Sequence, residues 1–151
     1  MATGIQASNS KRGTTIRLAE NVNASGLAAP TLATDGFDLA LLDKAYLWPE
    51  ACAISVYNAS GTGSLSIAYA KLWLYDLLST TWFPAGIGTD ANKGKLNGGA
   101  AMGVTATDQL RHREVLAYPA LADRWAIELN TVAGTNPAMN VDVFLPRDSR
   151  R

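Results

Sequence analysis

Apolar side chains recur at every second position along much of this chain, and this two-residue period constrains the fold more than any other feature. In the stretch Ala51–Phe83, Ile54 and Val56 alternate with polar or aromatic neighbours, and the alternation resumes after Asn58–Ser64, a turn-forming segment with two glycines. A half-buried β-strand has this period, and such a segment suits a hairpin loop. The stretch therefore predicts a strand, a turn, a long strand, a tight turn and a third strand.

Two segments near the end of the chain show the same alternation most clearly. Trp125, Ile127 and Leu129 fall on one face of the first, and four apolar residues fall on one face of the second, residues 139–145. The connecting Ala133–Pro137 has the composition of a turn. We expect the two strands to form an antiparallel pair.

Three other segments are less regular. Residues 36–44 alternate weakly, and we interpret them as a strand although their leucines also suit a helical turn. Residues 113–118 are interpreted as a strand in preference to a helix capped by Thr107. Residues 85–103 hold six of the thirteen glycines, so we expect a long loop that serves as a contact segment.

The first thirty residues are rich in Ala, Ser, Asn, Gly and Thr, and only Thr14–Val22 hints at a strand. Because they offer little apolar surface for a core, we interpret residues 1–30 as an extended N-terminal arm. Residues 31–146 are expected to form one β-sandwich domain, followed by a basic C-terminal tail at residues 147–151. The expected fold class is all-β: an antiparallel β-sandwich, jelly-roll-like, with an extended N-terminal arm.

The sequence carries one cysteine, Cys52, so no internal disulfide can form, and we interpret this residue as a small buried hydrophobe on a strand. The N-terminal segment lacks the apolar stretch of a secretory signal, and the uncharged interval between Glu50 and Lys71 is broken by glycine and asparagine. We therefore expect synthesis in a host cytoplasm and no membrane partner.

Charge is low and unevenly distributed. Only 17% of the residues are charged, against about a quarter in a typical domain. Residues 1–30 and 147–151 each carry a net +2, and because the whole chain is neutral the body between them carries −4. These two basic segments either dock on an acidic surface of a neighbouring subunit or are solvated chain termini, and the charge pattern favours neither interpretation over the other. The interface candidates are Lys11, Arg12, Arg17, Lys93, Lys95, Arg147, Arg150 and Arg151.

Residues with catalytic or metal-binding chemistry are few. The single histidine, His112, lies between two arginines, and the sequence has neither zinc-ligand spacing nor a Gly-x-Ser-x-Gly nucleophile motif. Residues 90–101 resemble a calcium loop only superficially, because Ala101 stands where a bidentate glutamate is required. We predict a non-enzymatic protein without catalytic residues, cofactor, metal or nucleic-acid partner. A hydrolase that depends on His112 is the least favoured hypothesis.

The four tryptophans are expected mostly in the core or at an interface. On a β-sandwich, however, an exposed row of aromatic rings can stack on sugar rings. The candidates for sugar stacking are Trp48, Trp73 and Trp82.

Three segments, Leu72–Asp76, Trp82–Gly86 and Arg124–Leu129, carry a resemblance to a known group of proteins. Together with the single cysteine, the polar N-terminal segment and the glycine-rich loop, they make the chain similar to small virion proteins of tailed bacteriophages, such as head decoration (cement) proteins. The resemblance transfers no residue role. It implies a homo-oligomer, often a trimer, seated on a lattice of the major capsid protein or another virion protein, with the arm reaching a neighbour.

The expected function is therefore that of a structural protein of a phage virion, a capsid decoration protein that acts through subunit contacts and is located in the virion. The alternative is a carbohydrate- or receptor-binding β-sandwich module that uses surface tryptophans. Deleting residues 1–30 is predicted to leave a folded sandwich that no longer enters the particle.

Overall fold

The computed structural model describes residues 6–9, 12–42, 51–59, 64–86, 91–105, 112–117, 122–134 and 137–146, and among these it contains strands and short 3-10 helices but no α-helix. The strands are β1 (Gln6–Asn9), β2 (Gly13–Val22), β3 (Phe37–Asp38), β4 (Ala51–Asn58), β5 (Ser64–Asp76), β6 (Thr81–Pro84), β7 (Met102–Thr105), β8 (His112–Ala117), β9 (Arg124–Gly134) and β10 (Met139–Pro146). The 3-10 helices are η1 (Leu39–Leu41) and η3 (Asn97–Gly99).

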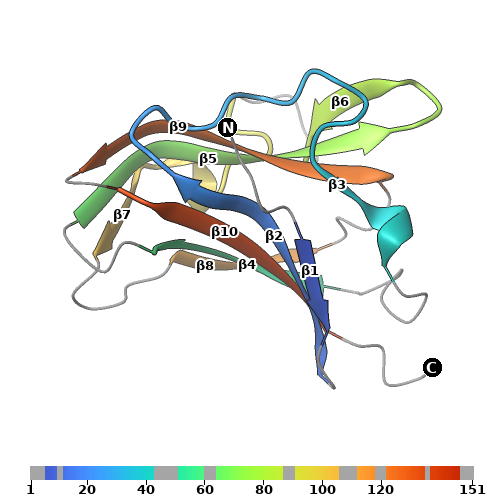
Figure 1. The fold of residues 1–151 in the computed structure, drawn as a ribbon. Helices are drawn as coiled ribbons and strands as arrows, with labels where there is room; N and C mark the ends of the chain where they lie inside the picture. Colours follow the sequence, from blue (N-terminus) through green and yellow to red (C-terminus); the bar gives the residue numbers. More distant parts are fainter. Residues whose placement is uncertain are drawn as a thin grey trace.

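The strands form two antiparallel sheets that face each other (Figure 1). Sheet A has the order β1-β2-β10-β4-β8, and sheet B has the order β3-β9-β5-β6, with β7 paired to the first part of β5. The pairing is nested along the chain, because β2 pairs with β10, β3 with β9, β4 with β8 and β5 with β6. The predicted all-β class is confirmed.

The nested order corrects two predicted hairpins. β4 and β5 do not pair, because β4 lies in sheet A and β5 in sheet B. The same holds for β9 and β10, which were expected to be an antiparallel pair. In both cases consecutive strands belong to different sheets, and turn-forming residues between two strands are as compatible with a change of sheet as with a hairpin. The tight turn between β5 and β6 is confirmed as a hairpin, with Asp76 paired to Thr81.

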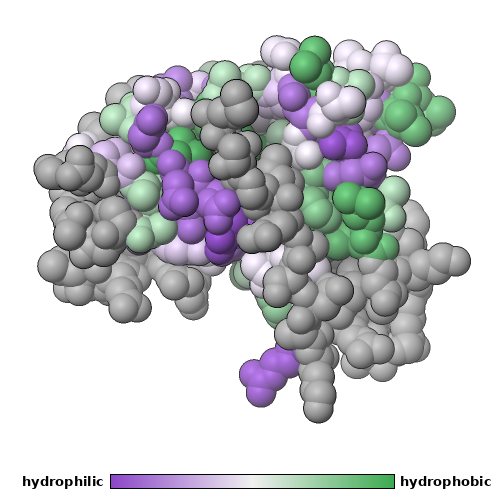
Figure 2. All heavy atoms as spheres, viewed as in Figure 1, coloured by the Kyte–Doolittle hydropathy of each residue, from purple (hydrophilic) through white to green (hydrophobic). Residues whose placement is uncertain are grey.

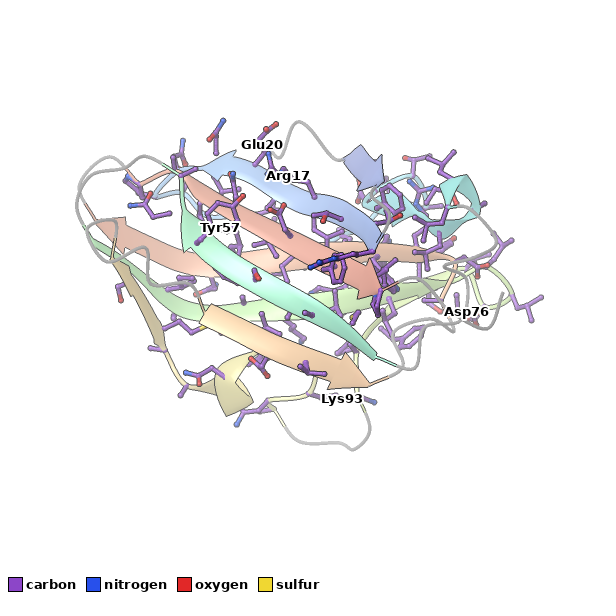
Figure 3. The ribbon with its side chains drawn as sticks, turned by 90° about the horizontal axis from the view of Figure 1, so that it is seen from below. Arg17, Glu20, Tyr57, Asp76 and Lys93 are labelled. Carbon is purple, nitrogen blue, oxygen red and sulfur yellow. The ribbon has the colours of Figure 1, made fainter. Side chains whose placement is uncertain are left out.

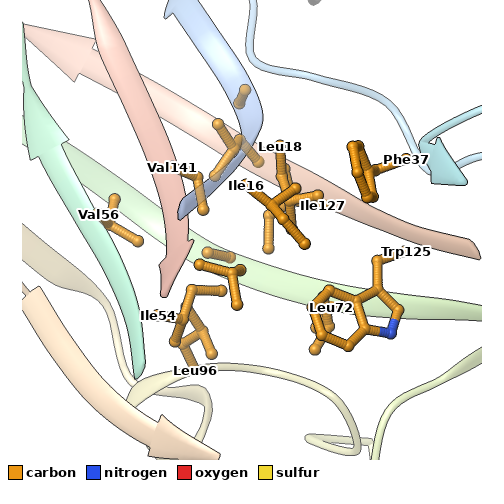
Figure 4. Close-up of a cluster of buried hydrophobic side chains, with 14 of the residues drawn as sticks. Ile16, Leu18, Phe37, Ile54, Val56, Leu72, Leu96, Trp125, Ile127 and Val141 are labelled. Carbon is orange, nitrogen blue, oxygen red and sulfur yellow. The ribbon is translucent and has the colours of Figure 1, made fainter. Parts of the chain in front are cut away.

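One hydrophobic core fills the space between the sheets (Figure 4). The predicted inward faces of β9 and β10 are confirmed, since Trp125, Ile127, Val141 and Val143 are at most 2% exposed. The two strands thus face each other across the core instead of lying side by side. Cys52 is also buried there, as predicted.

The predicted N-terminal arm is wrong for Gly13–Val22. This segment is β2, an inner strand of sheet A between β1 and β10. Ile16 and Leu18 are 0% and 2% exposed and belong to the common core. Four of the ten residues of β2 are buried in the core. This is enough for a strand, because the apolar side chains of the neighbouring strand β10 complete the buried surface.

Two further segments differ from the prediction. The expected strand over residues 36–44 is a strand only at Phe37–Asp38 and then turns into η1, where the Asp38 carboxylate accepts a hydrogen bond from the Ala40 amide. The expected loop over residues 85–103 contains η3 and the start of β7, and it contributes Leu96 to the core. The strand predicted near residues 113–118 is confirmed as β8.

Candidate interaction surfaces

Four leucines on three turns are exposed at one end of the molecule. We call this set, Leu32, Leu41, Leu77 and Leu78, the leucine end; its members are 62%, 75%, 63% and 97% exposed. Figure 2 shows hydrophobic spheres over the β5–β6 turn and, separated from them by hydrophilic spheres, near η1. A single exposed leucine is ordinary, whereas four on hydrogen-bonded turns favour a contact surface.

The β5–β6 turn is held rigidly. Asp76 accepts hydrogen bonds from the amides of Leu78 and Ser79, at 3.0 and 3.2 Å. The bond with the Ser79 side chain, followed by that with the Leu78 amide, lowers the pKa of Asp76 below its ordinary value. From outside the turn, the carboxylate of Asp123 accepts a bond from the Leu77 amide at 2.7 Å. The two leucines are therefore presented on a fixed backbone.

The same group of residues ties the other two turns to this one. The Asp123 carbonyl accepts a hydrogen bond from the Leu39 amide, which joins η1 to the β5–β6 turn. The indole of Trp82 donates to the Leu32 carbonyl at 2.9 Å. The guanidinium of Arg124 donates to the carbonyls of residues 34, 35 and 36. The leucine end is thus a single hydrogen-bonded unit.

Acidic side chains surround the leucines. Asp35 accepts bonds from the amides of residues 31 and 32, and Asp38 pairs with Arg124 at 3.4 Å. Asp76 and Asp123 bring the number of carboxylates at the leucine end to four. Arg124 supplies one positive charge, so the net charge of the leucine end is −3. A partner for this surface needs apolar side chains and positive charge.

A second surface lies on the outer face of sheet B. Tyr69 and Trp73 are half-buried on β5, and Glu128 faces them from β9. The Glu128 carboxylate accepts a bond from the Tyr69 hydroxyl and another from the Trp73 indole, both at 2.8 Å. These bonds fix the orientation of both rings. The hydrogen bond to Glu128, followed by burial, raises the pKa of the Tyr69 phenol above its ordinary value.

Two lysines cover these rings. The Lys71 ammonium lies 4.3 Å from the Trp73 ring centroid, and the Lys95 ammonium lies 4.4 Å from that of Tyr69. Lys71 and Lys95 are joined by a backbone bridge, so β5 and the segment before η3 bring them together. We call Tyr69, Lys71, Trp73, Lys95 and Glu128 the lysine–aromatic cluster.

The outer face of sheet A carries a polar network instead. The Arg17 guanidinium donates to both oxygens of Asp142, at 2.9 and 3.3 Å, and also to Glu20 and the Tyr57 hydroxyl. The bond to Asp142 raises the pKa of Arg17. Figure 3 labels Arg17 and Glu20 on β2 and Tyr57 on β4, with β10 between these two strands. The network joins β2, β10 and β4, and it uses most of the hydrogen-bonding capacity of Arg17 within the subunit.

The predicted site residues are scattered over the molecule. Arg12 is exposed at the start of β2, whereas Lys93 and Lys95 are half-buried in the segment before η3, and Figure 3 labels Lys93. Trp82 is half-buried, with its ring 5.1 Å from that of Tyr75. Of the predicted site residues that the structure describes, Lys95 and Trp73 come together in the lysine–aromatic cluster. Lys11, Trp48, Arg147, Arg150 and Arg151 lie outside the described residues.

The leucine end escaped the sequence prediction. The tight turn itself is predicted, but Leu77 and Leu78 are apolar residues directly after an apolar strand, so the periodic pattern gives no sign that they are exposed. The available signal was Asp76, because an aspartate side chain can accept hydrogen bonds from amides two and three residues later and so form a turn.

Groups with chemical reactivity are sparse among the described residues. Burial raises the pKa of the Cys52 thiol to about 12. No group of three histidine, cysteine or acidic side chains gathers in the described part of the chain as a metal site would require. The described residues also include no helix with the length and apolar character needed to cross a membrane. His112 begins β8, where its backbone pairs with Val56.

The comparisons with known proteins give no relative. No protein-family model matches the sequence, and neither a curated protein nor a solved structure shows significant similarity to it. The function of the chain must therefore follow from its own residues.

Proposed function

We propose that the chain is a jelly-roll β-sandwich. A jelly roll is an antiparallel arrangement in which the first of eight strands pairs with the last, the second with the seventh, and so on inward, before the ladder wraps into two sheets. Leaving aside β1 and β7, the nested pairs β2–β10, β3–β9, β4–β8 and β5–β6 follow this scheme. Shells of viral capsids are one common use of this architecture.

We further propose that the protein is a non-enzymatic structural component of a phage virion, a capsid decoration protein that forms a homo-oligomer and contacts the major capsid protein or another virion protein. It is made in the host cytoplasm and resides in the virion. The observation that carries the proposal is the leucine end, where Leu78 is 97% exposed on a turn that its own hydrogen bonds keep rigid. An apolar surface that is prepared in this way suits a permanent neighbour.

The occupant that we propose is a second copy of the chain. The leucine end carries −3, whereas residues 1–30 and 147–151 each carry +2, so copies of the chain attract one another at these places. Burying four partly exposed leucines stabilises a contact by on the order of 5 kcal/mol, at about 1.5–3 kcal/mol for each full burial. Because association itself costs about 4–15 kcal/mol, one such contact is weak, and a lattice of repeated contacts makes it durable.

The test removes the leucines without touching the residues that hold the turn. We expect the double variant Leu77→Ser, Leu78→Ser to fold normally but to shift from oligomer to monomer in sedimentation velocity and to be lost from purified particles. The matched control is Val115→Ser, since Val115 is 76% exposed on β8. A wild-type protein that is monomeric at all concentrations, or a double variant that assembles like the wild type, contradicts the proposal.

A second candidate function is carbohydrate binding. The observation that favours it is the lysine–aromatic cluster, where Trp73 and Tyr69 are half-buried and share the carboxylate of Glu128. Fixed aromatic rings beside a hydrogen-bonding carboxylate are a suitable surface for a sugar. Titration with oligosaccharides while tryptophan fluorescence is followed tests this candidate, because a protein with only a structural role gives no saturable change.

A further inference from the structure

We infer that the lysine–aromatic cluster binds an acidic oligosaccharide, one whose sugar rings carry carboxylates. The inference rests on the carbohydrate-binding candidate and names its ligand class. The ring faces, the ammonium groups and the carboxylate of the cluster each select for a part of such a ligand.

The first part is the pair of rings. Tyr69 and Trp73 are four residues apart on one face of β5, which places their Cα atoms about 13 Å apart. Both rings are tethered to Glu128, so they lose little freedom when a ligand binds. A ligand that contacts both must be longer than one sugar ring. Aromatic faces carry partial negative charge, which suits the C–H groups on the face of a pyranose.

The second part is positive charge. Lys71 and Lys95 place their ammonium groups over the two ring faces. Against Glu128, these two lysines give the cluster a net charge of +1 on a body that carries −4. A neutral sugar must displace the lysines from the rings, whereas an acidic sugar offers each ammonium a carboxylate. When a lysine ammonium moves away from a partly exposed ring, the lost cation–π contact weakens binding only by a factor of about three. The ion pairs that the lysines gain with an acidic ligand therefore decide the preference for acidic over neutral saccharides.

The third part is the Glu128 carboxylate between the rings. As an ionised carboxylate it only accepts hydrogen bonds, and sugar hydroxyls can donate them. Aromatic rings and lysines also bind single-stranded nucleic acid, whose charge lies on every nucleotide. A saccharide offers hydroxyl donors on every ring to the central carboxylate, whereas a deoxyribose–phosphate backbone offers none, so the acceptor Glu128 favours the saccharide.

The experiment uses the full chain and three probes: an oligogalacturonate long enough to span both rings, its methyl-esterified neutral counterpart, and an oligothymidylate of similar length. Affinity is measured by calorimetry and by tryptophan fluorescence. We expect the oligogalacturonate to bind at least tenfold more tightly than either other probe. The variant Lys71→Gln should weaken its binding by roughly tenfold, the loss of one charge-assisted contact. The control Arg12→Gln, which removes one charge directly before β2, should leave the affinity for the oligogalacturonate unchanged.

The outcomes separate the inference from the function on which it rests. Equal binding of the acidic and neutral saccharides overturns the inference and leaves carbohydrate binding in place. Binding of neither saccharide overturns both, and tighter binding of the oligothymidylate overturns both in favour of nucleic acid. Should Lys71→Gln disturb folding, seen as a shifted unfolding midpoint, Lys95→Gln and Trp73→Phe provide the same comparison on the other ring and on the indole bond.

Discussion

Replacing Leu18 by alanine should destabilise the protein as strongly as a substitution in the centre of the core. Leu18 is 2% exposed on the inner face of β2, within the cluster that both sheets share. Removing a buried leucine side chain costs about 2–5 kcal/mol, from the lost transfer free energy and the remaining cavity. The total stability of a domain is about 5–15 kcal/mol, so the variant should remain folded with a clearly reduced free energy of unfolding.

Urea unfolding followed by tryptophan fluorescence measures this effect, because Trp125 is buried in the same core. With a loss of about 3 kcal/mol and a slope of about 2 kcal/mol per molar urea, the midpoint should fall by about 1.5 M. The matched control is Val115→Ala at an exposed position outside the leucine end, expected to stay within about 0.5 kcal/mol of the wild type. A Leu18→Ala midpoint equal to that of the control would show that β2 is a dispensable arm.

By the same reasoning, deleting residues 1–30 should prevent folding, because the deletion removes β2 from the core. This replaces the expectation that the truncated chain stays folded.

Three further predictions concern single groups. Cys52, with a thiol pKa raised to about 12 by burial, should resist an aromatic disulfide reagent in native buffer and react at once in urea; rapid native labelling would contradict this burial. Glu128→Gln should move the raised pKa of Tyr69 toward its ordinary value, which a titration followed by phenolate absorbance measures. Because the pKa of Tyr69 is raised in the folded protein, the hydrogen bond to Glu128 stabilises the fold below the ordinary phenol pKa, and this stabilisation is lost as the pH rises through the folded pKa. Gly36→Ala should cost about 2 kcal/mol, since Gly36 has φ +71° and an added Cβ collides with the Trp125 carbonyl; an unchanged thermal midpoint would contradict the strain argument.

Local pattern predicted the strands better than it predicted their partners. The alternation in β4, β9 and β10 depends only on which side chains face the core, so the sequence shows it directly. Partner choice depends on residues far along the chain, as when β2 pairs with β10 across more than a hundred residues. The turn after β9 has the same composition whether it forms a hairpin or a crossing. Pairing was therefore beyond reach of a local argument.

The misread N-terminal segment has a different cause. Averaged over thirty residues, its apolar content is low, but within β2 the core positions are small or β-branched residues as well as Leu18. Thr14 is fully buried although it is polar, and Ala19 is 0% exposed although it is small. Such residues contribute little to an estimate of hydrophobicity, yet they fit closely beside β10. The strand was detectable only in a window of its own length.

The candidate surfaces were predictable to different degrees. Lys95 and Trp73 were both named from the sequence, but for different roles, because nothing local shows that the segment before η3 returns to the outer face of β5. The leucines of the β5–β6 turn were missed because exposure at a turn contradicts the usual placement of apolar residues. This exposure is informative, because an apolar side chain that a rigid turn holds in solvent does not stabilise its own subunit. It therefore favours a contact with another molecule.

The two surfaces are compatible in one molecule because the nested topology separates them along β5. Trp73 and Leu77 are four residues apart, or about 13 Å, and Tyr69 is about twice as far from Leu77. The leucine end lies beyond the end of the strand, whereas the lysine–aromatic cluster lies on the outer face of sheet B. A subunit that docks through its leucine end therefore leaves the cluster open to a ligand from outside. It follows that serine at positions 77 and 78 should change assembly without changing saccharide affinity, and that Lys71→Gln should do the reverse; a variant that changed both properties would show that the surfaces are one.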